Sequence, residues 1–187
     1  MIARIQLIVG FIASVSFVFL MAGCDNDQTS QNDNKTTNEQ KEGGMSVTVG
    51  PVDKQERVAP GKVDADAVLE FTETKSGLKY RILRKSEGKM PKASDNVTVH
   101  YKGWLDDESI FDSSYRRNEK ISFGLNQVIA GWTEGMQLVG VGGMIELDIP
   151  YSLGYGEQGS PGAIPPRARL HFIVELFKRA VVSRNRR

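Results

Sequence analysis

Apolar and polar residues alternate along several separate stretches of the chain, which is the pattern of β-strands with one buried face. The alternating apolar positions run from Leu78 to Ile82, Val97 to Tyr101, Ile145 to Ile149 and Leu170 to Leu176. Side chains in a strand point alternately to its two faces, so each stretch has one face suited to a core. The sequence therefore predicts an antiparallel sheet packed on one side.

One internal segment, residues 130–138, has apolar residues that could pack a helix against this sheet: Trp132, Met136 and Leu138. A second, short helix is predicted at 63–71, ahead of the first strand, from the helical spacing of its apolar residues. The predicted fold class is α+β, a curved antiparallel β-sheet wrapped around one short helix.

The first 23 residues have the organisation of a secretory signal. Arg4 supplies a short positive region, an apolar run follows, and small residues precede Cys24. The segment Met21-Ala22-Gly23-Cys24 resembles a bacterial lipobox, in which the cysteine is lipidated, for example with palmitate, and the signal is removed. The alternative is an uncleaved anchor, because residues 5–23 are nearly long enough to span a bilayer.

Residues 24–69 are expected to connect Cys24 to a folded domain. Residues 25–44 contain no apolar side chain, so this part is expected to be a disordered tether. A lead-in follows, and the domain is expected to span residues 70–180. The last residues, 181–187, form a basic tail for which solvation is a simpler explanation than binding.

Composition and charge argue against several classes of function. The chain has 24 basic and 23 acidic residues, and the only charge of the signal is Arg4, so the remainder is balanced and shows no nucleic-acid footprint. No cysteine or histidine spacing suits a metal, and no glycine-rich loop suits a phosphate, so no cofactor is expected. His100 and His171 lie out of phase with the apolar positions of their strands. Both are therefore expected at the surface or on the back of the sheet, not as catalytic bases.

Short sequence blocks within the domain occur in a characteristic order. They are His100-Tyr101-Lys102-Gly103-Trp104, Phe111-Asp112-Ser113-Ser114, Val128-Ile129-Ala130-Gly131-Trp132, Gly154-Tyr155-Gly156, and the loop and strand from Gly159 to Leu176. Together they resemble the FKBP-type peptidyl-prolyl cis–trans isomerases, over about residues 74–179. The resemblance implies the FKBP-like fold and an apolar pocket that binds X–Pro segments of polypeptides.

The resemblance implies that Trp132 is the floor of this pocket and that Tyr101, Phe111 and Phe172 are its walls. The other residues expected at the pocket are Asp112, Arg117, Val128, Ile129, Tyr155 and Ile164. Taken singly, Tyr101, Trp132 and Phe172 could equally be ordinary core residues. Tyr155 lies between two glycines, where a large side chain has little to pack on unless it lines a cleft.

Two further inferences concern single residues of the predicted pocket. Ile129 lies at the start of a helix, where backbone N–H groups are free for a ligand. Asp112 is expected to accept hydrogen bonds from Tyr101 or Arg117, the alternative being a surface carboxylate after a turn. Ile121 and Ala163 depart from the family pattern, so the binding of macrolide inhibitors that the resemblance implies is expected to be altered.

The expected function is isomerisation of X–Pro bonds in exported proteins, by a lipid-anchored protein of the bacterial cell envelope. If the cell has two membranes, the periplasmic face of the inner membrane is favoured, because Asp25 after Cys24 resembles a retention signal. The alternative is a non-catalytic FKBP-like peptide-binding or chaperone module tethered to the membrane. A purely structural surface lipoprotein would not explain Tyr155.

Overall fold

The structure, a computed structural model, describes residues 50–182. The predicted signal, the lipidated Cys24, the tether and the end of the basic tail lie outside the described residues. Within residues 50–182, no helix is long and apolar enough to cross a membrane. The strands are β1 (Thr72–Glu73), β2 (Lys79–Arg84), β3 (Asn96–Trp104), β4 (Ile110–Ser113), β5 (Ile121–Gly124), β6 (Met144–Ile149) and β7 (Leu170–Ala180); the α-helices are α1 (Ser114–Arg117) and α2 (Ala130–Gly135).

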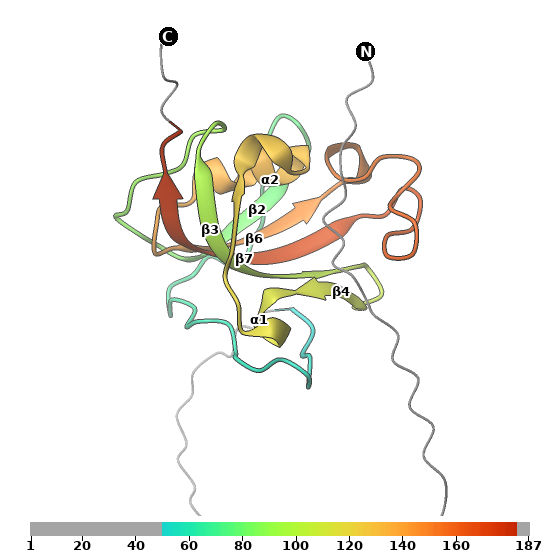
Figure 1. The fold of residues 1–187 in the computed structure, drawn as a ribbon, viewed down its shortest axis with the longest axis horizontal. Helices are drawn as coiled ribbons and strands as arrows, with labels where there is room; N and C mark the ends of the chain where they lie inside the picture. The colour runs from blue at the N-terminus through green and yellow to red at the C-terminus, as the bar shows by residue number, and fades with distance from the viewer. Residues whose placement is uncertain (1–49, 183–187) are drawn as a thin grey trace, which may run out of the picture. The chain divides into compact units, whose positions relative to one another are not determined.

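All of these strands belong to one antiparallel sheet, in the order β1-β2-β6-β7-β3-β4, with β5 also paired to β3. The strand β7 lies between β6 and β3 and pairs with both along most of its length (Figure 1). Each of the alternating stretches forms a strand, so the predicted α+β fold with a curved sheet and a short helix is confirmed.

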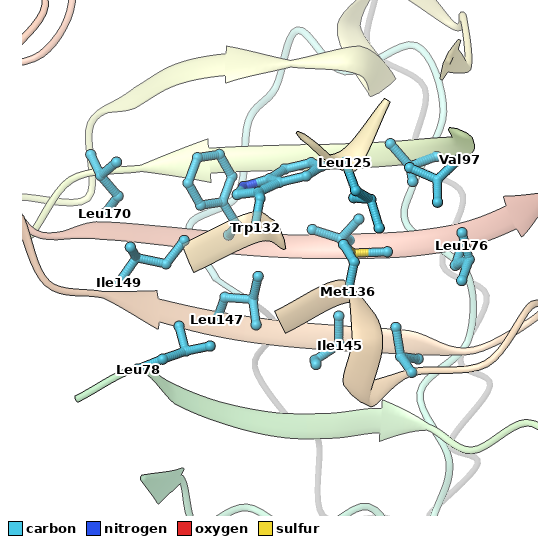
Figure 2. Close-up of a cluster of buried hydrophobic side chains, with 14 of the residues drawn as sticks. Leu78, Val97, Leu125, Trp132, Met136, Ile145, Leu147, Ile149, Leu170 and Leu176 are labelled. Atoms are coloured by element: carbon cyan, nitrogen blue, oxygen red, sulfur yellow. The ribbon is translucent and has the colours of Figure 1, made fainter. Parts of the chain in front are cut away.

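The helix α2 covers one face of the sheet, which we call the front face. Trp132 and Met136 are buried there among apolar side chains of β6, β7 and β3 (Figure 2). Gly131 and Gly135 lie one turn apart on the helix side that faces β6. A Cβ atom at Gly131 would lie 2.5 Å from Ile149 Cγ2, and one at Gly135 would lie 2.6 Å from a Leu147 methyl carbon. The two glycines therefore allow α2 to lie deep in the concave front face.

The helix predicted at 63–71 is wrong. Residues 50–69 contain no helix and form an extended strap on the back face of the sheet, opposite α2 (Figure 1). The backbone N–H of Asp64 donates to the Leu83 carbonyl of β2 at 2.8 Å and not to a helical partner. Val63 packs on a second apolar cluster of Leu83, Trp104, Met144 and Ile173, whereas Val68 and Phe71 stay exposed. Contact with the sheet thus replaces the local helix.

Polar groups of the strap pair with buried charges of the back face. Lys102 Nζ donates to the Pro51 carbonyl at 3.0 Å and lies 3.5 Å from the Glu56 carboxylate. Glu175 accepts the Gly61 N–H at 2.9 Å and the Arg84 guanidinium at 2.8 Å. Burial alone would raise the pKa of Glu175, but these donors lower it. The strap is therefore packed against the sheet and is not a free linker.

Candidate functional site

Aromatic rings gather on the front face around Trp132. The ring centroid of Trp132 lies 5.2 Å from that of Phe172 and 5.4 Å from that of Tyr101, both nearly edge-to-face. Phe111 is edge-on to Phe172 at 5.5 Å. Phe123 of β5 lies 5.4 Å from Trp132 and was not anticipated from the sequence. Edge-to-face pairs at these separations are favourable, so the predicted floor and walls form one contiguous cluster.

A β-bulge in β4 brings two consecutive residues to the same face. Asp112 pairs with Gly103 of β3 and Ile110 pairs with Trp104, so Phe111 is the extra residue between these pairs. Without the bulge, neighbouring side chains would point to opposite faces. With it, Phe111 packs on the front cluster while Asp112 also reaches that side.

Gly103 makes room for this arrangement and was also missed from the sequence. A Cβ atom there would lie 2.6 Å from Phe111 Cζ and 2.6 Å from Phe172 Cε1. A glycine inside a strand marks close approach by another group, and this was the signal available in the sequence. Gly103 therefore lets both rings lie against the β3 backbone.

Asp112 orients Tyr101. The Tyr101 hydroxyl donates a hydrogen bond to Asp112 Oδ2, and Arg117 Nη1 donates to Asp112 Oδ1 at 2.9 Å. Burial and then the Asp112 charge raise the pKa of Tyr101, so its hydroxyl stays protonated. Burial lowers the pKa of Arg117, but the hydrogen bond and charge of Asp112 and the smaller effects of Tyr101 together outweigh it, so its pKa is raised. The hydroxyl is thus fixed as a donor to Asp112, with the ring held against Trp132.

The remaining predicted residues come from the segments beside this cluster. Val128 and Ile129 directly precede α2 and pack on the front core, half-buried. The Ile129 carbonyl accepts the N–H groups of Trp132 and Thr133 at 3.0 and 3.1 Å. Ile164 is buried in the same core and lies in the loop between β6 and β7. All three therefore belong to the same apolar core as Trp132 and Phe172.

Tyr155 differs from the other aromatic residues predicted for the pocket because it is exposed. Its side chain lies in the loop between β6 and β7 and is 43% accessible to solvent. Partial burial and then the charge of Asp112 raise the pKa of its hydroxyl. Gly159 of the same loop has φ +66°, and a Cβ atom there would lie 2.3 Å from the Ile164 carbonyl oxygen. This glycine is therefore needed for the tight turn that places Ile164.

Both histidines lie on the back face, away from the aromatic cluster. His100 is buried there, stacks on Tyr115 at 4.9 Å and is hydrogen-bonded through Nδ1 to Ser114 Oγ at 2.8 Å. Burial, followed by the charge of Lys120, lowers the pKa of His100. His171 stacks on Trp104 at 5.7 Å. Both histidine side chains therefore point away from the front-face core, as predicted. His100 is buried on the back of the sheet and is not a surface residue.

The back face also carries a cavity of about 480 Å³ that includes none of the predicted site residues. Its lining residues are Gly50, Pro51, Val52, Phe71, Trp104, Glu108, Glu146, Asp148 and His171.

Among the described residues, no group of three or more histidine, cysteine, aspartate or glutamate side chains could hold a metal ion.

Comparisons with known proteins identify the class of protein to which this fold belongs. Residues 87–177 match the family of FKBP-type peptidyl-prolyl cis-trans isomerases. A probable FKBP-type peptidyl-prolyl cis-trans isomerase of Haemophilus influenzae is 50% identical over 104 residues, which are 56% of this chain and 43% of that protein. The FKBP-type 22 kDa isomerase of Escherichia coli is 47% identical over 105 residues, 56% of this chain and 51% of that protein.

A solved structure agrees with these sequence matches. The crystal structure of a peptidyl-prolyl cis-trans isomerase from Pseudomonas syringae is 33% identical, with a TM-score of 0.56, and the match covers 59% of this chain and 81% of that one. The chain belongs to the FKBP-type peptidyl-prolyl cis-trans isomerase family. It spans about half the length of the two curated relatives described above.

Proposed function

We propose that residues 70–180 catalyse cis–trans isomerisation of X–Pro bonds in exported polypeptides, and that a lipid at Cys24 tethers them to the membrane. The observation that carries the isomerase proposal is the aromatic cluster around Trp132, with Tyr101 held by Asp112. The proline ring of the client would lie on Trp132, between Tyr101, Phe111 and Phe172. Family membership supports the same activity.

Such a cluster can accelerate this reaction without an acid or a base. Rotation about the amide has a barrier of about 20 kcal/mol, because the planar form is stabilised by resonance. Water stabilises the polar planar amide more than the twisted one, so an apolar surface that excludes water favours the twisted state. Every ~1.4 kcal/mol of preference for that state gives a tenfold increase in rate. We therefore assign Asp112 the role of positioning the Tyr101 ring. Its carboxylate accepts hydrogen bonds from the Tyr101 hydroxyl and from Arg117.

The direct test is exchange spectroscopy by NMR on a short peptide with one Ala–Pro bond, with the full chain added in catalytic amount. We expect cis–trans exchange, which takes tens of seconds or longer without catalyst, to become much faster. Exchange at the rate of the peptide alone, together with measurable peptide binding, would instead identify a non-catalytic peptide-binding module. A macrolide inhibitor added to the same sample would test whether it competes for the site.

The membrane tether makes a separate prediction. Cys24→Ser is expected to abolish labelling by a palmitate analogue and to leave the protein either released from the membrane or uncleaved, because Cys24 is the sole thiol and residues 25–44 are entirely polar. Membrane fractionation and the size of the protein on a gel measure both effects. A Cys24→Ser protein that remains membrane-bound at full length and keeps its function would support the signal-anchor alternative.

The membrane concerned is a further part of the proposal. Asp25 directly follows Cys24, and we place the protein on the periplasmic face of the inner membrane in a cell with two membranes. Density-gradient separation of the membranes tests this placement. Recovery with outer-membrane markers alone would overturn it without affecting the isomerase proposal.

A further inference from the structure

The short helix α1 lies between the strap and the aromatic site. It has only four residues, and its N-cap residue Ser113 makes no side-chain capping bond. A helix of this length cannot be stable by itself. Its orientation must therefore come from tertiary contacts.

The sheet supplies contacts to two of the helix residues. Ser114 Oγ accepts the backbone N–H of Tyr101 at 2.8 Å. The Tyr115 hydroxyl donates to Glu175 Oε1 at 2.7 Å, and the ring is buried. These contacts hold Ser114 and Tyr115 of α1, but neither involves Arg116 or Arg117 at its end.

The strap supplies contacts to the other residues of this segment. Arg116 Nε donates to the buried Asp53 carboxylate. Ser113 Oγ donates to Glu56 Oε1 at 3.1 Å. The backbone N–H of Arg57 donates to the Tyr115 carbonyl at 3.1 Å. The strap therefore holds residues 113–116 by both side chains and backbone.

Asp53 is itself hydrogen-bonded within the strap. Its Oδ1 accepts the backbone N–H of Gln55 at 2.8 Å, which fixes the carboxylate within its own turn. That hydrogen bond, followed by the one from Arg116, lowers the pKa of Asp53 even though burial acts in the opposite direction. The carboxylate thus accepts hydrogen bonds from both the Gln55 backbone and the Arg116 guanidinium.

The two residues that flank the held segment, Asp112 and Arg117, are the pair that holds the Tyr101 hydroxyl. A rotation of residues 113–116 would separate them, because the chain connects each directly to one end of this segment. We propose that Asp53 is a positioning residue for the substrate site, which acts through Arg116 to keep Arg117 on Asp112. This inference rests on the proposed isomerase function. It makes the strap a functional part of the domain.

The test compares Asp53→Asn with Asp66→Asn in the full chain. Asp66 also belongs to the strap and pairs with Lys85 at 2.6 Å, but both side chains are exposed and contact neither α1 nor the aromatic cluster. We expect Asp53→Asn to lower kcat/KM for the Ala–Pro peptide roughly three- to tenfold. Asp66→Asn should change it less than about twofold, as for an exposed ion pair. Circular dichroism at the assay temperature checks that both variants are folded.

A double-mutant cycle separates positioning from general stability. Because Asp53 acts through Arg117, Asp53→Asn should have almost no further effect on kcat/KM in an Arg117→Met background. In the otherwise unchanged chain, Asp53→Asn should also shift the NMR signal of the Arg117 Nε–H group, and Asp66→Asn should not. An equal loss in both backgrounds, or an unchanged Arg117 signal, would overturn the inference.

The outcomes distinguish this inference from the function on which it rests. If the unaltered chain fails to accelerate exchange, the isomerase proposal fails, and the Arg117 signal alone still decides whether the strap positions this side chain. If the unaltered chain is active and Asp53→Asn behaves as Asp66→Asn does, the isomerase proposal stands and the role of Asp53 is refuted.

Discussion

Replacement of Phe111 by alanine is expected to lower kcat/KM for an X–Pro peptide about ten- to a hundredfold. This loss corresponds to ~1.4–2.8 kcal/mol of transition-state stabilisation. Phe111 lies at the bulge of β4, with its ring edge-on to Phe172 at 5.5 Å. Loss of the ring would remove a wall of the aromatic cluster and admit water to the reacting amide. The measurement is NMR exchange over a range of enzyme concentrations.

His171→Ala is the matched control for Phe111→Ala. His171 is also an aromatic residue of the sheet, but it stacks on Trp104 on the back face. We expect its replacement to leave kcat/KM within about twofold, since no reacting group lies on that side. If His171→Ala caused the larger loss while the unfolding midpoint stayed the same, an aromatic site on the front face would be the wrong mechanism.

Removal of the strap is expected to have the largest effect on stability. The free energy of unfolding of a chain that begins at residue 70 should be about 2–4 kcal/mol lower than that of one that begins at residue 50, because the back-face apolar cluster that contains Trp104 loses its cover. Without the strap, Lys102 and Glu175 lose hydrogen-bond partners but become hydrated by water. Their contribution to the loss of stability is therefore smaller than that of the apolar cluster. Urea unfolding measures the difference, as a decrease of about 1–2 M in the midpoint.

The chain that begins at residue 50 is the reference for this comparison, because it contains all of residues 50–69 that the structure describes. Equal midpoints for the chains that begin at 50 and at 70 would mean that the strap adds no stability and that a domain boundary at residue 70 is adequate.

The sequence predicted the sheet because alternation with a period of two is a local signal that each strand carries by itself. Leu147 and Val174, for example, are buried for reasons visible in their immediate neighbours. The strap could not be predicted in this way. Its partners lie far along the chain, as Glu56 does from Lys102 and Gly61 from Glu175, and such pairs leave no periodic trace.

The candidate site shows the same division. The hydrogen bonds of Asp112 with Tyr101 and Arg117 were anticipated, and the structure contains both. The bulge that turns Phe111 and Asp112 to one side depends on the register between β3 and β4. Register is a property of two strands together, so neither segment alone could reveal it. Gly103 was overlooked although a glycine inside a strand signals close approach by another group, and the packed structure shows that the rings of Phe111 and Phe172 are the groups that exclude a side chain there.

The position of β7 determines when the sheet can be completed as the domain folds. This strand is the last one of the described chain, yet it lies at the centre of the sheet between β3 and β6 (Figure 1). A chain of which only the part up to residue 160 is free to fold would leave β3 and β6 with unpaired edges, which are prone to join other chains. Completion of the sheet must therefore wait until Leu170–Ala180 is free to pair, and a chaperone that shields those edges would be needed most just before that moment.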